Sequence, residues 1–417
     1  MNVLLVHNDY GKPSGEEYAV ERISQLLQGN GHIVRTFRRS SAELVGSPWG
    51  AMKGFFCGIH NPYAARALDG YLVGNRPDVV VVQNIYPLLS ASIFGVLHRH
   101  RLPVVMRCPN YRLFCPNGLH LAKGQVCERC LGPGREWWCV LRNCEDSILK
   151  SAGYALRNAV ARVRGSITRR VHVFLVQSQF QKDRFIRNGI RGDRIEILPG
   201  MAHMNGCSEQ VALGDVVSYV GRISPEKGIV QFIKAARLLP EIPFEVAGDD
   251  RQMPHLRSQA PNVRWLGFLD ETQLHDLYLR SRMVVVPSLC YEGFPNVMIQ
   301  AMALGKPLVC SDIGGLPEII GYGACGVMVK PGNSEDLASK VRLLRSDPLR
   351  CRQLGSAGRE RVHREYSPQV AYERLMTAFH KAIGANLRDA AVAQDRGVDS
   401  AADDVAVAAP SDQSGGV

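Results

Sequence analysis

Short apolar runs alternate with helical patterns along the chain, in two successive series. Strands that alternate with helices indicate parallel sheets, because parallel strands need a helical crossover between them. A weakly periodic stretch with several glycines, residues 200–214, separates the two series. The predicted strands are 3–6, 32–37, 79–82, 104–107, 172–176 and 195–198 in the first series and 216–220, 244–247, 263–266, 283–286 and 307–310 in the second.

This pattern predicts an α/β fold with two Rossmann-like, doubly wound domains that face an interdomain cleft. We expect the N-terminal domain at residues 1–200, with a cysteine-containing insert at about 108–150, and the C-terminal domain at 214–365. Residues 385–417 hold mainly Ala, Asp, Ser, Gly and Val, without period or aromatic residues. We expect a disordered tail there, because such a composition buries too little apolar surface to offset the entropy of ordering.

The composition is that of an ordinary globular protein, with 46% hydrophobic and 21% charged residues among 417. It excludes a disordered, collagen-like or coiled-coil chain. The first residues carry no positive leader, and their apolar run is too short for a signal peptide or an anchor. We therefore expect a cytoplasmic protein, whose 12 cysteines are thiols or metal ligands.

The net charge of +11 is concentrated in one segment. Between Lys150 and Arg194, eleven Lys or Arg are offset by only two Asp, a local net charge of +9. Apolar residues recur there near helical spacing, which predicts a basic amphipathic helix. It would lie on an anionic membrane or meet an acidic partner, or else its apolar stripe would cover its own domain. Nucleic acid is not an expected partner, because few aromatic residues are interleaved with the basic ones. The apolar positions are Leu149, Leu156, Val160, Val163 and Ile167.

The segment Gly221–Gly228 follows a predicted strand and leads into a helix. Its loop would project Arg222 and Lys227 into the cleft, where an Arg fork and a Lys point charge suit the two phosphates of a diphosphate. The alternative is a solvated loop in which Glu226 pairs with these cations.

A second loop, Pro287–Val297, has the same position after a strand and before a helix. Its backbone N–H groups, with Asn296 as N-cap, would form an anion site. Glu292 would accept hydrogen bonds from sugar hydroxyls. As an alternative, Glu292 is a capping or surface carboxylate. After the next strand, Gly314 and Gly315 allow close backbone approach.

In these motifs the chain resembles the retaining glycosyltransferases of family 4, which have the two-lobed GT-B fold. The resemblance covers nearly all of residues 1–384. It implies that Arg222, Lys227 and Glu292 are catalytic, with both cations on the donor diphosphate and the carboxylate on the donor sugar. It also implies that a helix at 366–384 packs back on the N-terminal domain. The substrate-binding positions that it implies are Gly15, in a loop that closes over the donor, and Gly293, Phe294, Pro295, Asn296, Val297, Gln300, Gly314 and Gly315.

Two positions depart from the family pattern. Gln300 lies eight residues beyond Glu292, where the family usually has a Glu that grips the ribose hydroxyls. Gln can still donate to and accept from a hydroxyl, so we expect a weakened or altered donor affinity. Pro109 precedes the segment Asn-Tyr-Arg-Leu-Phe-Cys-Pro, where relatives usually have His. Pro has no proton to exchange, so a catalytically degenerate nucleotide-sugar binding protein is the alternative function.

Four cysteines of the insert have a spacing that suggests a structural zinc site. Cys127 and Cys130 form a close pair, which Cys115 and Cys144 flank, and Cys139 competes for the last place. Buried core thiols or a disulfide are the alternatives. A catalytic metal is not expected at four thiolates, because they leave no open coordination position.

The function that we predict is transfer of a sugar, with retention, from a nucleoside-diphosphate-sugar to a saccharide or lipid-linked acceptor. No Asp-x-Asp occurs in the sequence, so we expect no cofactor in catalysis, with basic side chains neutralising the leaving group. The basic N-terminal domain and the resemblance together favour surface polysaccharide or glycolipid synthesis. We expect peripheral association with the inner face of the cytoplasmic membrane.

Overall fold

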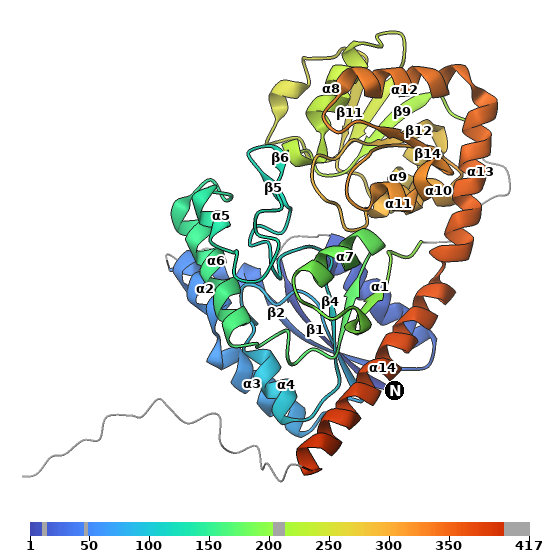
Figure 1. Cartoon of the computed structure of the whole chain (residues 1–417). Coiled ribbons are helices and arrows are strands. Elements are labelled where there is room, and N and C mark those ends of the chain that lie inside the picture. The colour runs from blue at the N-terminus through green and yellow to red at the C-terminus, as the bar shows by residue number, and fades with distance from the viewer. Residues whose placement is uncertain (11–14, 46–48, 203–212, 396–417) are drawn as a thin grey trace, which may run out of the picture.

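The computed structural model describes residues 1–10, 15–45, 49–202 and 213–395. These residues form two lobes, each built on a six-stranded parallel sheet with helices on both faces (Figure 1). A two-stranded antiparallel hairpin, β5 (Leu121–Ala122) and β6 (Gln125–Val126), projects from the first lobe. The predicted architecture of two doubly wound α/β domains is confirmed.

The first sheet has the strand order β2-β1-β3-β4-β7-β8, so its order reverses between β1 and β3. Every residue of β3, β4 and β7 is buried, because helices cover both faces of the sheet. Its strands are β1 (Asn2–Asp9), β2 (Ile33–Ser40), β3 (Val79–Val82), β4 (Val104–Arg107), β7 (Val173–Val176) and β8 (Ile195–Ile197). The helices of this lobe are α1 (Gly15–Gly29), α2 (Gly50–Ile59), α3 (Pro62–Val73), α4 (Ile93–Arg99), α5 (Trp138–Leu141), α6 (Ile148–Val163) and α7 (Gln179–Arg187).

The second sheet has the order β11-β10-β9-β12-β13-β14, which reverses between β9 and β12. Its strands are β9 (Val216–Val220), β10 (Phe244–Ala247), β11 (Val263–Gly267), β12 (Ser281–Val286), β13 (Leu308–Ser311) and β14 (Gly326–Val329). The helices here are α8 (Ile229–Arg237), α9 (Glu271–Arg280), α10 (Asn296–Ala303), α11 (Leu316–Ile319), α12 (Ser334–Ser346) and α13 (Pro348–Glu365).

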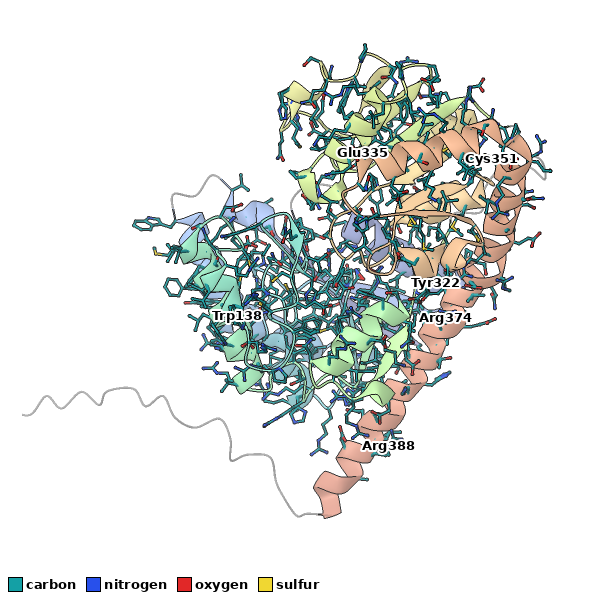
Figure 2. All side chains as sticks on the ribbon, turned by 45° about the horizontal axis from the view of Figure 1, so that its top comes forward. Trp138, Tyr322, Glu335, Cys351, Arg374 and Arg388 are labelled. Carbon is teal, nitrogen blue, oxygen red and sulfur yellow. The ribbon has the colours of Figure 1, made fainter. Side chains whose placement is uncertain are left out.

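The last helix, α14 (Pro368–Asp395), runs from the second lobe along the first, and Arg374 and Arg388 mark its course in Figure 2. Leu375 and Phe379 are buried against the first sheet, in one core cluster with Val3 and other strand residues. Residues of this helix therefore complete the core of the other lobe.

The predicted tail boundary at residue 385 is wrong, because α14 continues to Asp395. The segment 385–395 is rich in alanine, the strongest helix former, and continues the preceding helix. Two of its side chains also reach the first lobe. Asn386 donates to the Arg101 carbonyl at 3.1 Å, and Asp389 lies 3.7 Å from His172 Nε2. The rest of the predicted tail, 396–417, lies outside the described residues.

Helix α6 is the amphipathic helix that the sequence predicts, but its apolar row faces outward. Leu149, Leu156 and Val163 are 78%, 49% and 69% exposed, whereas Arg157 is buried. The interpretation that this stripe covers its own domain is therefore wrong for these three residues. Within the described part of the chain, no helix combines the length and the apolar character needed to cross a membrane.

Candidate functional site

The two motif loops of the second lobe lie side by side. The loop that holds Arg222 and Lys227 follows β9, the loop that holds Glu292 follows β12, and these two strands are neighbours in the sheet. The strand order reverses between them, and open parallel sheets bind their ligands at the carboxyl ends of the strands beside such a reversal. The fold therefore brings the two motifs to one crevice.

Lys227 and Glu292 form a direct ion pair across this crevice. Lys227 Nζ donates to Glu292 Oε1 at 2.6 Å and to Oε2 at 2.8 Å, although the residues are 65 positions apart. Ser288 Oγ donates to Oε1 of the same carboxylate at 2.7 Å. Three polar groups from two loops are thus fixed relative to one another. This contact shows that Lys227 and Glu292 lie close enough together to act in one site, as the sequence predicts.

Both members of the pair are ionised. Burial is the largest effect on Glu292 and raises its pKa, but the Lys227 ammonium and the hydrogen bonds from Lys227 and Ser288 hold it below its usual value. Burial likewise works against the charge of Lys227, and Glu292 nonetheless raises the pKa of this lysine. The carboxylate keeps lone pairs for sugar hydroxyls, and the ammonium has three N–H donors, of which Glu292 takes two.

A glycine contact locks the two loops together behind this pair. Gly228 has φ +74°, and a Cβ on it would lie 1.8 Å from the Pro287 carbonyl oxygen. Next to this contact, the Leu289 N–H donates to the Glu226 carbonyl at 2.8 Å. Only glycine combines the left-handed backbone with such a close approach.

Arg222 lies at the open end of the same loop and is 66% exposed. Its Nη2 is 3.2 Å from Glu226 Oε1, which also accepts from Ser224 Oγ at 2.7 Å. This is the partner that the solvated-loop alternative names for Arg222, whereas Lys227 pairs with Glu292 instead. An exposed ion pair contributes only about 0–1 kcal/mol, so a phosphate can replace Glu226 at little cost.

The loop after Glu292 lies against the first lobe. A Cβ on Gly293 would be 2.3 Å from the side-chain amide of Gln177 and 2.7 Å from the Pro109 carbonyl oxygen. Phe294 is buried and packs on the ring of Tyr366, with centroids 5.1 Å apart. The glycine is therefore required by the contact between the lobes.

Helix α10 begins directly after this loop. Asn296 is its first residue, half-buried like Val297, while Pro295 occupies the cap position without a side-chain cap bond. The predicted N-cap role of Asn296 is therefore wrong. Farther along the helix, Gln300 Oε1 accepts a hydrogen bond from Tyr278 Oη at 3.1 Å.

The paired glycines after β13 allow a third backbone to approach. Gly314 has φ +62°, and its Cβ would lie 3.2 Å from Tyr291 Cα. A Cβ on Gly315 would be 3.0 Å from Ser178 Oγ of the first lobe. Glu318, three residues on, accepts hydrogen bonds from the backbone N–H groups of residues 179 and 180 at 2.8 and 3.2 Å. This loop therefore fastens the second lobe to the N-terminus of α7.

On the first lobe, Gly15 begins α1, and residues 11–14 of the predicted glycine loop lie outside the described residues. The residue after it, Glu16, accepts hydrogen bonds from Tyr10 Oη at 3.1 Å and from Asn110 Nδ2 at 3.0 Å. Arg112 Nη1 donates to the same tyrosine oxygen at 2.7 Å. These bonds hold the start of α1 against the Asn-Tyr-Arg segment.

Arg107, the last residue of β4, was not among the site residues predicted from the sequence. This arginine is buried, and its Nη1 donates to Gln83 Oε1 at 3.0 Å. Gln177 bridges its Nη2, at 3.2 Å, to the Pro109 carbonyl, at 3.1 Å. Arg107 and Pro109 line a small, open cavity together with Glu16 and Arg112. An arginine at the end of an otherwise apolar strand was the available signal.

The insert cysteines are all free thiols. A hydrogen bond between the Cys139 and Cys144 thiols raises the pKa of Cys139 and lowers that of Cys144. Burial and then the neighbouring thiols of Cys115, Cys144 and Cys127 raise the pKa of Cys130. The five cysteines are thus neighbours, and zinc on Cys115, Cys127, Cys130 and Cys144 stays a prediction.

Over the described ranges, one group of three side chains has its metal-ligating atoms within 4.8 Å of one another, namely His7, Asp9 and Glu17. No three cysteine thiols in these ranges lie that close together. Arg38 Nη1 lies 3.9 Å from Asp9 Oδ1. A guanidinium therefore already neutralises part of this group, which no sequence motif indicated.

Two facing parallel-sheet lobes, with a cationic and an anionic loop at the strand reversal of one of them, define a protein of the GT-B class. The family model for glycosyl transferases group 1 matches residues 214–361, and that for the glycosyl transferase 4-like domain matches residues 14–200. The chain therefore belongs to the glycosyl transferases of group 1, with an N-terminal domain of the glycosyl transferase 4-like type.

Among curated relatives, glycogen synthase from Mycobacterium tuberculosis is 36% identical over 162 residues, 36% of this chain and 39% of the relative. Alpha-D-kanosaminyltransferase from Streptomyces kanamyceticus is 29% identical over 188 residues, 42% of this chain and 48% of the relative. The chain thus spans less than half the length of these relatives.

Solved structures match over almost the whole fold. Sucrose-phosphate synthase from Thermosynechococcus elongatus has a TM-score of 0.68 at 18% identity, covering 92% of this chain and 99% of its own. The Anabaena protein HepE, in complex with UDP and glucose, has a TM-score of 0.63 at 18% identity, covering 91% and 99%. The predicted GT-B fold is confirmed.

Proposed function

We propose that the protein transfers a sugar, with retention of configuration, from a nucleoside-diphosphate-sugar to a saccharide or lipid-linked acceptor. The observation that carries this proposal is the Lys227–Glu292 pair, fixed by two loops at the strand reversal of the second sheet. A structural neighbour described with UDP and glucose, and relatives described as glycogen synthase and kanosaminyltransferase, support a nucleotide-sugar donor.

The roles in this proposal follow from the charges. Lys227 and Arg222 stabilise the negative charge that develops on the leaving diphosphate, and Glu292 orients the donor sugar through its hydroxyls. In a front-face displacement, the leaving phosphate oxygen takes the proton of the acceptor hydroxyl. Pro109 then needs no proton to exchange, and basic side chains supply the charge neutralisation without a metal.

The acceptor in this proposal occupies the cavity of the first lobe. Its lining includes Pro109, whose carbonyl lies beside Gly293 of the donor loop, and two arginines, Arg107 and Arg112. Guanidinium groups suit an acceptor that carries a phosphate or a carboxylate. Such an acceptor fits surface polysaccharide or glycolipid synthesis on the cytoplasmic face of a membrane.

A thermal-shift screen tests donor binding. Purified protein is heated with UDP, GDP, ADP or dTDP and their sugar conjugates, in a chelator that removes metals. One nucleoside diphosphate is expected to raise the melting temperature clearly, because a ligand that binds only the native state stabilises it. The absence of a shift with every one of them would contradict the proposal. Binding without any sugar transfer to membrane extracts would favour the alternative, a binding protein that has lost catalysis.

Gln300→Glu is expected to tighten binding of the active nucleoside diphosphate about fivefold, because a carboxylate accepts a stronger hydrogen bond from ribose than an amide does. A glutamate can also keep the bond from Tyr278 Oη. Titration calorimetry of both proteins measures the change. Gln273→Glu on α9 is the matched control, since this residue lies in a capping box that accepts either side chain. An unchanged dissociation constant for Gln300→Glu would refute the ribose role.

A further inference from the structure

Two adjacent helices of the first lobe expose a row of large apolar side chains. From α2 and its cap, Trp49 and Phe56 are 68% and 61% exposed. From α6, the three residues of its outer row are exposed as described above. We call these positions the α2–α6 face. Its members are Trp49, Met52 and Phe56 together with Ile148, Leu149, Leu156 and Val163.

The two rows belong to one surface. Leu149, Leu156 and Val163 are spaced seven residues apart, so they lie along one side of the helix over about 21 Å. Helix α2 packs directly against α6, since a Cβ on Gly153 would be 2.3 Å from the ring of Phe55. In Figure 1 both helices lie on the side of the first lobe remote from α14.

The domain is fastened to α6 by polar contacts instead. Arg157 is buried, and its guanidinium lies over the rings of Tyr86 and Tyr154 at 3.9 and 4.6 Å. Beside it, Asn158 donates to the Arg112 carbonyl at 2.8 Å. The buried residues of α6 are small or polar, namely Ser151, Gly153, Ala155, Arg157 and Asn158, so the row of large apolar side chains is left to water. A contiguous apolar face of this kind marks an interaction surface.

The charges around the face select its partner. Helices α2 and α6 contain Lys53, Lys150, Arg157 and Arg162 and no Asp or Glu. Lys53 is exposed, and Lys150 and Arg162 are exposed at 61% and 41% of their side chains. Lys150 lies 3.8 Å from Glu145 and Arg162 lies 2.6 Å from Glu136, and ion pairs at the surface are weak enough for headgroup phosphates to replace these carboxylates. An apolar row flanked by cations is the pattern of a helix that lies in the interface of an anionic bilayer, where lysines and arginines reach the headgroups.

We propose that the α2–α6 face docks on the surface of an anionic membrane, with its apolar side chains entering the boundary of the acyl region. Docking of this face would bring the acceptor cavity of the same lobe to lipid-linked acceptors, and in this respect the inference rests on the proposed function. The membrane contact itself needs no transfer activity. It is peripheral, and it places Trp49 at the level of the headgroups.

Vesicle flotation with the full chain tests the docking. The protein is expected to bind vesicles made of an equal mixture of phosphatidylglycerol and phosphatidylethanolamine. It is expected to bind vesicles of phosphatidylcholine only weakly. The triple variant Phe56→Ser/Leu149→Ser/Leu156→Ser is expected to partition at least about tenfold more weakly, since three exposed side chains no longer leave water. The matched control is Leu343→Ser/Leu349→Ser, which changes exposed leucines of the second lobe and is expected to bind like the unmodified protein.

Three results would overturn the proposal. The first is an unmodified protein that fails to bind the anionic vesicles, and the second is a triple variant that binds as well as the unmodified protein. The third is light scattering that shows a dimer in the unmodified protein and a monomer in the triple variant, which would assign the face to a second copy of the chain. The nucleoside-diphosphate thermal shift, measured on the same proteins, is expected to be equal in all of them. Vesicle binding without any nucleotide shift would refute the proposed function and leave the docking intact.

Discussion

Lys227→Ala is expected to reduce kcat/KM for sugar transfer by about 10²- to 10³-fold, because it removes a charge-assisted donor from the leaving diphosphate. Affinity for the nucleoside diphosphate is expected to fall as well. The variant also leaves Glu292 in a largely buried position without the cation that lies 2.6 Å from its Oε1. Steady-state kinetics of transfer and calorimetry of nucleotide binding measure the two effects.

Two controls separate catalysis from stability in this experiment. Lys234→Ala removes an exposed lysine from the helix that follows the same loop, and it is expected to leave kcat/KM unchanged. Lys227→Met/Glu292→Gln removes both charges, so no carboxylate is left buried without a partner. This double variant is expected to regain the melting temperature but not the activity. Full activity in Lys227→Ala would refute the assignment of this lysine to the leaving group.

The sequence predicts most of the strands, though not β14, because they are short runs in which apolar residues dominate. Residues 79–82, 104–107, 216–220 and 244–247 are strands with the predicted bounds. Parallel strands covered on both faces are mainly apolar, apart from single buried polar residues such as Ser218 and Glu245, so their signal does not depend on the partner strand. The order of the strands in each sheet, by contrast, cannot be predicted from any local pattern of residues. The adjacency of β9 and β12, which creates the Lys227–Glu292 contact, therefore came only from the structure.

The orientation of α6 shows where periodicity fails. The spacing of Leu149, Leu156 and Val163 predicts an apolar side, and an apolar side of a globular helix ordinarily faces the core. Here the core side is held by Arg157, stacked on Tyr86 and Tyr154. Tyr154 lies on α6 itself, but Tyr86 comes from another segment that no helical spacing reveals, and a buried guanidinium is stabilised only where such partners meet it. A pattern of residue types thus fixes the two sides of a helix but not which side faces inward.

In the candidate site, the residue types were predictable and their partners were not. In the solvated-loop alternative Glu226 pairs with both cations, but in the structure it pairs with Arg222, and Lys227 pairs with Glu292. Arg107 was missed because its one local signal, an arginine at the end of an apolar run, does not show whether the side chain is buried or what it binds. Its partners, Gln83 and Gln177, follow two other strands of the first sheet. Hydrogen-bond networks of this kind need residues from the ends of several strands, and the sequence does not show which strand ends lie side by side.

Gly228→Ala is expected to destabilise the protein by about 3 kcal/mol, from the left-handed backbone and the steric clash together. The added Cβ would lie 1.8 Å from the Pro287 carbonyl oxygen, so the loop after β9 must move away from the loop after β12. The melting temperature should fall by roughly 6–12 °C. Nucleotide affinity should fall with it, because Lys227 and Glu292 lose their fixed separation.

Gly267→Ala separates the two contributions. Gly267 has φ +71°, close to that of Gly228, but a Cβ on it would meet no atom within 4 Å. This variant is expected to cost about 1–2 kcal/mol, the strain of the left-handed backbone alone, and to leave nucleotide affinity unchanged. Calorimetric unfolding of both variants measures the difference. Equal losses in the two variants would show that the approach of the two loops contributes nothing, and that the glycine is required only for its backbone conformation.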